Sequence, residues 1–278
     1  MQHYILLLDC PDQKGLVYNI TRVLYQHDLN IVSNNEFVDL ERQHFFMRTE
    51  VEGNINETNL LADLYAALPK QVKLVLTQEH KKKIVVLATK EYHCLGDLLL
   101  RNHFDNLNAE ILAVISNHNN LADLVTQFKI PFHYLPHENI LRDTHEKQVL
   151  DLINRYNPDF LVLAKYMRIL SPYFVSHFRE QMINIHHSFL PAFIGANPYK
   201  QAFERGVKII GATAHFVTNN LDEGPIIAQA TIPVDHTHNA ASMAQAGRDV
   251  ETLVLAKALK LVFEDRVFIS QNKTVIFD

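Results

Sequence analysis

Short apolar runs dominate the chain beyond about residue 82 and limit the folds that it can adopt. Five of them alternate with segments of helical pattern: KIVVLAT from Lys83, AEILAVIS from Ala109, PFHYL from Pro131, DFLVLAKY from Asp159 and MINIHHS from Met182. Strands that are apolar on both faces and separated by helices predict an α/β fold with a mostly parallel, Rossmann-like sheet covered on both sides. Two later runs, IIGATAHFVT and GPIIAQATIPV, joined by the turn-rich NNLDEG, are expected to pair and extend that sheet. A long helix is expected over 239–263.

The first 80 residues follow a different pattern. The runs HYILLLDC, NIVSNNEFVDL, HFFMRTEVEG and VKLVLTQ have strand composition, and residues 16–24 and 56–68 have amphipathic helical spacing. This order predicts a small βαββαβ, ferredoxin-like domain. The polar segment QEHKKK over 78–83 lies where the pattern changes. We therefore expect domains at 1–80 and 83–278, which agrees with the guideline of roughly 150 residues per domain.

Charge and composition exclude several classes of protein. Residues 1–80 hold 6 Lys and Arg against 11 Asp and Glu, whereas the remainder holds 20 against 20. The larger part therefore lacks the basic excess that nucleic-acid binding requires. No apolar run approaches the roughly 18–20 residues of a membrane span, and Asp9 and Asp12 interrupt the N-terminal run where a signal peptide stays apolar. We expect a cytoplasmic protein that binds neither membrane nor nucleic acid.

The two cysteines, Cys10 and Cys94, are far apart in the sequence. This spacing excludes a disulfide framework and a cysteine zinc cluster. Both are expected to be buried or free thiols.

Polar residues gather at the predicted carboxyl end of the strand in MINIHHS, which is where open α/β sheets bind ligands. On that strand Asn184 and His186 share one face, whereas His187 points to the other. Asp222 lies in the turn-rich loop NNLDEGP. An amide, an imidazole and a carboxylate on neighbouring strand ends can polarise a carbonyl, stabilise its oxyanion and handle a proton.

Each of these residues also has a purely structural interpretation. A single histidine on a strand is more often structural, and an aspartate between Asn and Gly is usually turn chemistry. A metal site is the third possibility, with ligands from His186, His187 and His215, or from His236 and His238. No H-E-x-x-H motif or cysteine cluster accompanies these histidines, so we expect no metal.

The segment NIHHSFLPAFIGANPYKQAFERGVKIIGATAHFVTNNLDEGPIIAQ resembles the signature of the formyltransferases that use 10-formyltetrahydrofolate. The resemblance implies that Asn184, His186 and Asp222 are the catalytic residues and that Leu190–Pro191 forms the family's turn. LAKYMRILSP looks like the family's folate-pocket stretch, which implies that a set of four residues lies along the pterin: Met167, Arg168, Ile169 and Leu170. Plain core packing remains an equal alternative for the three apolar members of that set.

Departures from the family pattern limit which molecules can accept the formyl group. Glycinamide ribonucleotide transformylases carry a loop rich in Gly and Ser whose amides hold the substrate phosphate. Here that segment is TKEYHCLGDLL, with bulky or charged residues from Lys90 to Cys94. Methionyl-tRNA formyltransferases carry a further C-terminal domain, which we do not expect here. Water is then the expected nucleophile, and the products are formate and tetrahydrofolate, with no tightly bound cofactor.

The N-terminal segment LLDCPDQKGLVYNITRVLYQHDLNIVSNNEFVD resembles an ACT domain. An ACT domain followed by a formyltransferase-like domain resembles the formyltetrahydrofolate deformylases, and His187 fits them because transformylases commonly carry Pro there. The resemblance implies a homo-oligomer paired through ACT domains, formate supply for purine synthesis, and an amino-acid effector such as glycine or methionine. The expected effector residues are Asp9, Asp12, Lys14, Gly15, Asn30 and Asn34.

Two other functions remain open. The first is transfer of the formyl group to an amine acceptor, which predicts acceptor-dependent release of tetrahydrofolate. The second is a folate-binding regulator without turnover. In the N-terminal unit, Asp12 and Gly15 have the alternative of shaping the turn alone.

Overall fold

The structure, a computed structural model, describes residues 2–192 and 198–278. It divides into two compact units. The first unit holds Met1–His80 with two short C-terminal segments, Asp265–Phe268 and Val275–Asp278, and the second holds Lys81–Glu264 with Ile269–Thr274. The sequence did not indicate that C-terminal residues join the first unit.

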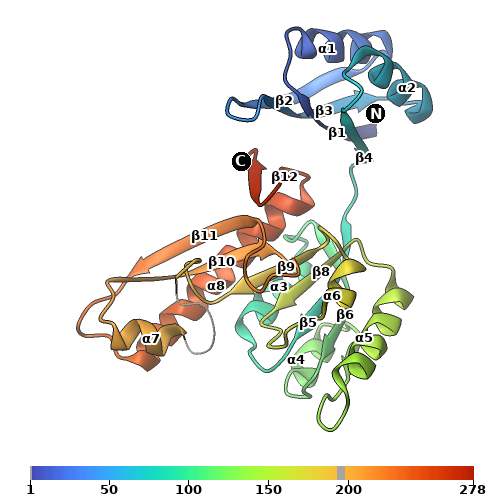
Figure 1. Cartoon of the computed structure of the whole chain (residues 1–278). Helices are drawn as coiled ribbons and strands as arrows, with labels where there is room; N and C mark the ends of the chain where they lie inside the picture. The colour runs from blue at the N-terminus through green and yellow to red at the C-terminus, as the bar shows by residue number, and fades with distance from the viewer. Residues whose placement is uncertain (1, 193–197) are drawn as a thin grey trace. The chain divides into compact units, whose positions relative to one another are not determined.

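The first unit has the predicted βαββαβ order. Its elements are β1 (Gln2–Pro11), α1 (Leu16–Gln26), β2 (Asn30–Asp39), β3 (His44–Gly53), α2 (Glu57–Ala67) and β4 (Lys73–Gln78). The strands form an antiparallel sheet in the order β2-β3-β1-β4 (Figure 1). The strand β2 is one edge of this sheet.

Both helices of the first unit bury an apolar stripe against the sheet. On α1 the buried residues recur at helical spacing, and the inward residues of β1 alternate, as each element's period requires. They form one cluster that includes Leu6, Leu8, Leu16, Ile20, Leu24, Leu60 and Leu64. Gly15 begins α1 in the left-handed region, at φ 92°, which glycine adopts without steric cost.

The other face of β3 packs against the C-terminal segment. The rings of Phe46 and Phe268 lie 5.6 Å apart, edge to face, and Arg48 Nε donates to the backbone oxygen of Asp265 at 2.9 Å. Arg48 is 2% exposed, so its guanidinium needs these partners inside the protein.

The second unit is the predicted α/β domain with a mostly parallel sheet. Its strands are β5 (Lys82–Ala88), β6 (Ala109–Ser116), β7 (Phe132–Tyr134), β8 (Phe160–Ala164), β9 (Met182–His186), β10 (Ile209–Phe216) and β11 (Ile226–Pro233). They lie in the order β11-β10-β9-β8-β5-β6-β7. β5 to β9 pair in parallel, whereas β10 pairs antiparallel with both β9 and β11. The expected strand pair therefore extends the parallel sheet at one end.

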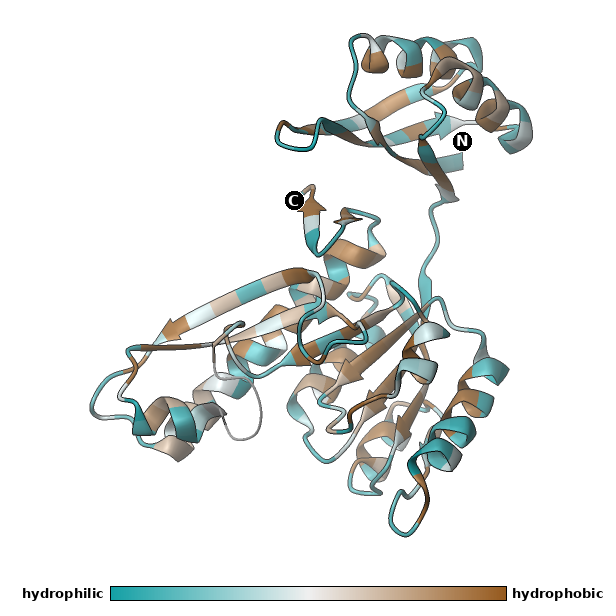
Figure 2. Ribbon diagram, in the orientation of Figure 1, coloured by the Kyte–Doolittle hydropathy of each residue, from teal (hydrophilic) through white to brown (hydrophobic). Residues whose placement is uncertain are grey.

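Helices cover both faces of this sheet. They are α3 (His93–His103), α4 (Ala122–Gln127), α5 (Arg142–Tyr156), α6 (Pro172–Ser176), α7 (Pro198–Glu204) and α8 (Ala240–Phe263). α5 and α6 pack on one face, where side chains such as Ile153 and Phe174 meet Leu87 and Leu163 of the strands. α8 lies against β9, β10 and β11 and contacts α3 on the opposite face (Figure 1). The central parallel strands are mostly hydrophobic, whereas α5 is largely hydrophilic on its outer side (Figure 2).

The long helix α8 starts with a reciprocal cap. Asn239 Oδ1 accepts from Ser242 N, and Ser242 Oγ accepts from Asn239 N, both at 2.9 Å. After α8 the chain forms a hairpin of β12 (Val267–Ser270) and β13 (Lys273–Ile276), which the sequence did not predict.

The structure tests two further expectations, one about the cysteines and one about membrane-spanning helices. Cys10 and Cys94 are free and buried, as predicted. Over the described ranges, no helix is both long enough and apolar enough to cross a membrane.

Candidate functional site

The candidate site lies where β8 and β9 end and the loop after β10 returns to them. A pocket of about 300 Å³ opens there. Residues from three segments line it, including all seven residues predicted for catalysis and folate binding: Asn184, His186, Asp222, Met167, Arg168, Ile169 and Leu170. Parallel strands bring their carboxyl ends to one edge, which explains why distant segments meet here.

Direct contacts join the three polar residues through a fourth. His186 Nδ1 lies 3.3 Å from Asp222 Oδ2, and Asn184 Nδ2 lies 3.3 Å from His215 Nε2. His215 Nδ1 donates to the backbone oxygen of Phe216 at 2.9 Å, which leaves Nε2 as the acceptor for the Asn184 amide. His215 therefore fixes the orientation of Asn184, a role that the sequence analysis missed because it considered this residue only as a metal ligand.

The surroundings of Asp222 keep its carboxylate ionised. Burial opposes ionisation, but the hydrogen bond with His186 and the nearby His215 outweigh it and hold the pKa of Asp222 below its usual range. The opposite ring nitrogen of His186, Nε2, is buried and has no hydrogen-bond partner among the described residues. An ionised aspartate that orients one nitrogen of a histidine leaves the other nitrogen for a substrate.

Gly224 holds the loop that carries Asp222. A Cβ at Gly224 would lie 1.8 Å from the backbone oxygen of Phe216, so only glycine allows this approach. Phe216 N also donates to the backbone oxygen of Pro225 at 2.9 Å. Asp222 itself has a φ of 56° in this turn. The loop is therefore anchored to the end of β10 immediately after Asp222.

Hydrogen bonds fix the backbone of the predicted folate stretch, residues 167–170, while the side chains of Met167 and Ile169 stay accessible. Met167 N donates to Thr89 Oγ1 at 3.0 Å, and Arg142 Nη2 donates to the backbone oxygen of Ile169 at 2.7 Å. Met167 is 58% exposed and Ile169 is 63% exposed. Core packing is therefore wrong for these two residues, whereas Leu170 is partly buried against the core beneath it.

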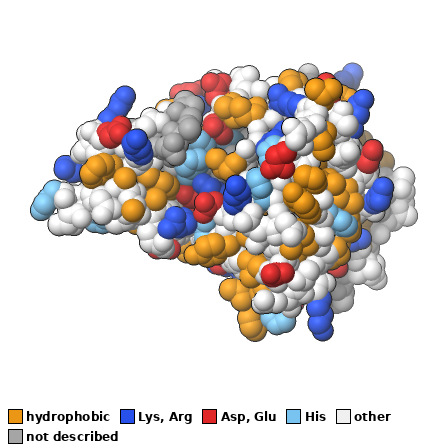
Figure 3. Space-filling model, turned by 90° about the horizontal axis from the view of Figure 1, so that it is seen from below, with side chains coloured by type: hydrophobic (Ala, Val, Ile, Leu, Met, Phe, Trp, Pro, Cys, Tyr) orange, Lys and Arg blue, Asp and Glu red, His pale blue; other side chains and the backbone are white. Residues whose placement is uncertain are grey.

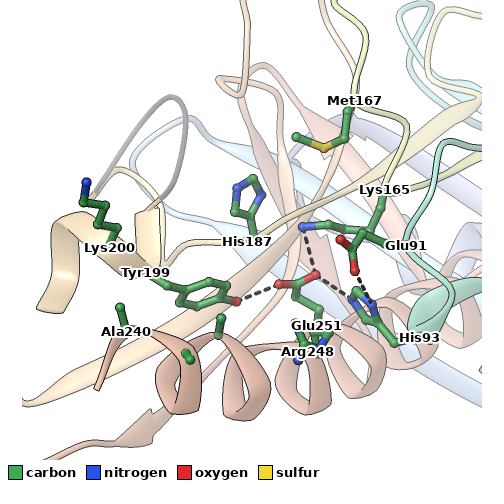
Figure 4. Close-up of a pocket in the computed structure, with 12 residues that line it drawn as sticks. Glu91, His93, Lys165, Met167, His187, Tyr199, Lys200, Ala240, Arg248 and Glu251 are labelled. Carbon is green, nitrogen blue, oxygen red and sulfur yellow. Dashed lines mark hydrogen bonds and ion pairs between the residues drawn. The ribbon is translucent and has the colours of Figure 1, made fainter. Parts of the chain in front are cut away.

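A second, polar hollow adjoins this pocket. Its volume is about 430 Å³, and it shares Lys165, Met167 and His187 with the first pocket. Figure 4 shows the residues around it, and in Figure 3 acidic, basic and histidine side chains are intermixed on the face that is seen. We refer to it below as the polar hollow.

Glu251 of α8 is the centre of the polar hollow. It accepts from Tyr199 at 2.6 Å and lies 2.8 Å from His93 Nε2 and 3.1 Å from Lys165 Nζ (Figure 4). Burial opposes its ionisation, but these three partners hold the pKa of Glu251 below its usual range. Sequence reasoning missed this network; the available signal was one acidic residue on the apolar side of a long helix.

The segment from Lys90 to Cys94, which the sequence predicts to lack a phosphate-binding loop, contributes His93 to this network. His93 begins α3, and its side chain lies 2.8 Å from Glu251. This segment therefore supplies a side chain to the network around Glu251.

Two groups of described residues have metal-ligand atoms within 4.8 Å of one another: His93 with Cys94 and Glu251, and His118 with His137 and Glu138. In the first group Lys165 already neutralises Glu251, and burial together with Glu251 raises the pKa of the Cys94 thiol, so that it stays protonated. Neither group contains His236 or His238, the pair considered from the sequence.

The structure separates one expected effector residue from the others. Asp9 lies near the end of β1, with Asp12, Lys14 and Gly15 in the following turn. Asn30 lies opposite Glu52 of β3, which lies opposite His3 at the start of β1. His3 and Asp9 are thus about 20 Å apart at about 3.4 Å per residue.

Three of the expected effector residues already have polar partners. Asp9 pairs with His44 at 2.8 Å, Asn30 donates to Glu52 at 2.9 Å, and Asn34 accepts from Thr49 at 2.7 Å. Asn34 lies midway along the sheet between Asn30 and the turn after β1. Within one chain the expected effector residues do not form a single site.

Comparisons with known proteins cover both units. Residues 82–259 match the formyl transferase family, and residues 4–68 match the ACT domain family. Formyltetrahydrofolate deformylases from Haemophilus influenzae and Escherichia coli are 58% and 56% identical, over 98% and 99% of both chains. A crystal structure of the formyltetrahydrofolate deformylase from Pseudomonas syringae superposes with a TM-score of 0.95 at 39% identity, covering all of this chain and 95% of its own.

Proposed function

Because the chain belongs to the formyltetrahydrofolate deformylase family, we propose that it hydrolyses 10-formyltetrahydrofolate to formate and tetrahydrofolate at the pocket that holds Asn184, His186 and Asp222. The observation that carries the site assignment is the contact of Asp222 with His186 Nδ1, which leaves Nε2 for the substrate. The formate would be a one-carbon unit for purine synthesis, and its release would balance the folate pool.

The folate would lie along the exposed apolar side chains of Met167 and Ile169. Apolar surface beside a few polar groups is the usual composition of a cofactor-sized pocket. Arg168 and Leu170 line the same pocket. The formyl group would then lie at the carboxyl end of β9, beside the loop that carries Asp222.

In the reaction, the oxygen of a water molecule bonds to the formyl carbon and the carbonyl oxygen gains negative charge. The Asn184 amide and His186 stabilise this oxyanion. The bond from carbon to N10 then breaks, N10 takes a proton that came from the water, and formic acid ionises to formate. Atoms and charge balance with water as the only co-reactant.

Asp222 orients His186 rather than removing the proton itself. Its carboxylate oxygens face His186 and His215, so they are not free to bind the attacking water. An aspartate here could orient His186 or accept the proton of the water, and these contacts favour the first role.

Transfer of the formyl group to an amine acceptor is the second candidate function. It would need room for the acceptor next to the formyl carbon. The bulky or charged side chains from Lys90 to Cys94 disfavour a phosphorylated acceptor. Hydrolysis is therefore the better supported reaction.

For the N-terminal unit we propose regulation by an amino acid such as glycine or methionine, bound near Asp9, Asp12, Lys14 and Gly15, with Asn34 closer to this turn than Asn30. The regulatory domain would span 1–80 and the catalytic domain 83–278.

Pairing of the N-terminal units between copies of the chain is supported by the edge strand β2, which carries exposed Val32 and Phe37. Light scattering should then give a multiple of 32.0 kDa. Two free, buried thiols fit a cytoplasmic location.

The variants Asn184→Ala, His186→Ala and Asp222→Ala test the site assignment. Loss of one oxyanion donor typically costs about 2.7–4 kcal/mol of the barrier, so kcat should fall by a factor of about 100 to 1000. Equilibrium binding of tetrahydrofolate should change little, since the apolar lining remains. Any of the three variants with near parental turnover would show that its residue has another role.

A further inference from the structure

His187 lies next to the oxyanion donors, and the proposed mechanism leaves its role open. It follows His186 directly, and the two rings lie 5.2 Å apart. His187 lines the folate pocket and also the polar hollow, so it lies where the two meet. Lys165 and Met167 line both pockets as well, so these three side chains mark the junction.

The ring of His187 is not used in holding the fold together. Among the described residues, none forms a hydrogen bond or ion pair with it, and its printed ring contacts are with His186 and Tyr199, at 5.2 and 6.1 Å. Figure 4 shows the ring in the hollow beside Tyr199, Lys165 and Met167, with no interaction drawn to it. Its nitrogens therefore face the site without a protein partner in the described ranges.

The two carboxylates nearest the junction of the pockets are already engaged. Glu251 has Lys165, His93 and Tyr199 as partners, and Asp222 is turned to His186 and His215. A carboxylate saturated in this way is a poor acceptor for a further proton. Besides His186 Nε2, which the proposed mechanism assigns to the oxyanion, the ring of His187 offers a nitrogen without a described partner at the junction of the two pockets.

The charge state of His187 suits an acceptor. Burial, followed by the nearby Lys165, lowers the pKa of His187 to about 4. The imidazole is therefore neutral near pH 7, with one protonated nitrogen and one lone pair. A neutral ring accepts a hydrogen bond from water, which a protonated ring cannot do.

We propose that His187 is a catalytic residue that binds the attacking water at the mouth of the polar hollow and accepts its proton. As the water oxygen bonds to the formyl carbon, the O–H bond breaks and the proton passes to the free nitrogen of His187. When the bond from carbon to N10 breaks, the proton passes to N10, and His187 returns to its neutral form. This inference rests on the proposed hydrolysis and assigns its proton transfer.

The division of labour follows from the surroundings of the two adjacent histidines. His186 faces an ionised aspartate and serves the oxyanion, whereas His187 lies beside a lysine and serves the water. Two similar groups with different surroundings are a common way to separate acid and base roles in one site.

The test compares the parent chain with His187→Ala and His187→Gln. The parent is first assayed with 10-formyltetrahydrofolate and no amine, and formate release there establishes the hydrolysis independently of His187. We expect His187→Ala to lower kcat by at least about 30-fold with unchanged tetrahydrofolate binding. His187→Gln keeps an acceptor oxygen and should retain more activity than His187→Ala. His177→Ala, at an exposed histidine outside both pockets, is the matched control and should keep the parental rate.

Chemical rescue separates a role in catalysis from a role in packing. The polar hollow has room for a free imidazole once the side chain is truncated. Added imidazole should raise the rate of His187→Ala severalfold and leave the parent unchanged. A kcat of His187→Ala within about threefold of the parent, or a loss that imidazole does not relieve, overturns the role of His187. No formate release from the parent would instead overturn the hydrolysis, and this inference with it.

Discussion

Asn184, His186 and His187 owe their different roles to neighbours from other segments. Alternation along β9 sends the first two side chains to one face. What they meet there comes from the loop after β10, which supplies Asp222, and from β10 itself, which supplies His215. His187 meets Lys165, which follows β8. In the proposed account, one strand end thus carries both an oxyanion site and a water site.

Ile169 provides a test of the folate pocket that leaves the core untouched. It lines the pocket and is 63% exposed, so Ile169→Asp should fold normally. Loss of apolar contact and a charge against the pterin should raise KM about tenfold or more, since burying one such side chain contributes about 1.5–3 kcal/mol. Steady-state kinetics with 10-formyltetrahydrofolate measure this.

Ile209→Asp is the matched control, because Ile209 is 54% exposed and lies at the start of β10, outside both pockets. It should leave KM at the parental value. Equal values of KM for both variants would mean that the folate does not lie along Ile169.

At this scale the sequence predicted the pocket residues through a resemblance but not the contacts that fix their chemistry. Glu251 and Lys165 are 86 residues apart in the sequence, yet their side chains lie 3.1 Å apart. No local pattern predicts such a pair, because it arises from the packing of α8 against the sheet. His215 was considered only as a metal ligand, since its contact with Asn184 depends on the antiparallel pairing of β9 and β10.

The loop after β10 is the element on which the site most depends. Gly224→Ala would place a Cβ 1.8 Å from the backbone oxygen of Phe216, so the loop must move. Asp222 would then shift relative to His186, and kcat should fall by about tenfold or more, because small displacements in a preorganised site are costly. Turnover at saturating folate measures this effect.

Gly96→Ala is the control for this change, since nothing lies within 4 Å of a Cβ at that position. Gly96 is inside α3, where alanine is favoured by up to about 1 kcal/mol, so this variant should keep its activity and melt slightly higher. If Gly224→Ala kept the parental rate as well, the loop would not need this close approach.

Elements with strong periodicity were predicted well. The apolar runs of β5, β6 and β8 and the alternating strands of the first unit appear where their patterns place them. The hairpin of β12 and β13 was not predicted, because each strand has only four residues and Phe268 gains its burial from Phe46 in a distant segment. Short strands stabilised by distant partners carry little local signal.

The two units divide chemistry and regulation in the proposed account. Negative charge is concentrated in residues 1–80, whereas the catalytic part is balanced. Hydrolysis by water needs no amine acceptor, so the supply of an acceptor cannot limit its rate.

The effector proposal predicts that glycine or methionine binds the full chain. Calorimetric titration should show binding of one of them, and Asp12→Ala in the turn before α1 should weaken it by about tenfold or more, through loss of a charged hydrogen bond. Glu41→Ala, at an exposed turn between β2 and β3, is the control and should bind as the parent does. Absence of binding for both amino acids would remove the regulatory role assigned here to this turn.

The most direct test of the central claim is turnover of 10-formyltetrahydrofolate by the purified chain with no amine present. Formate and tetrahydrofolate should appear in equal amounts over many turnovers, and His186→Ala should abolish most of this release. Release of tetrahydrofolate only after addition of an amine, with the formyl group found on that amine, would contradict the account.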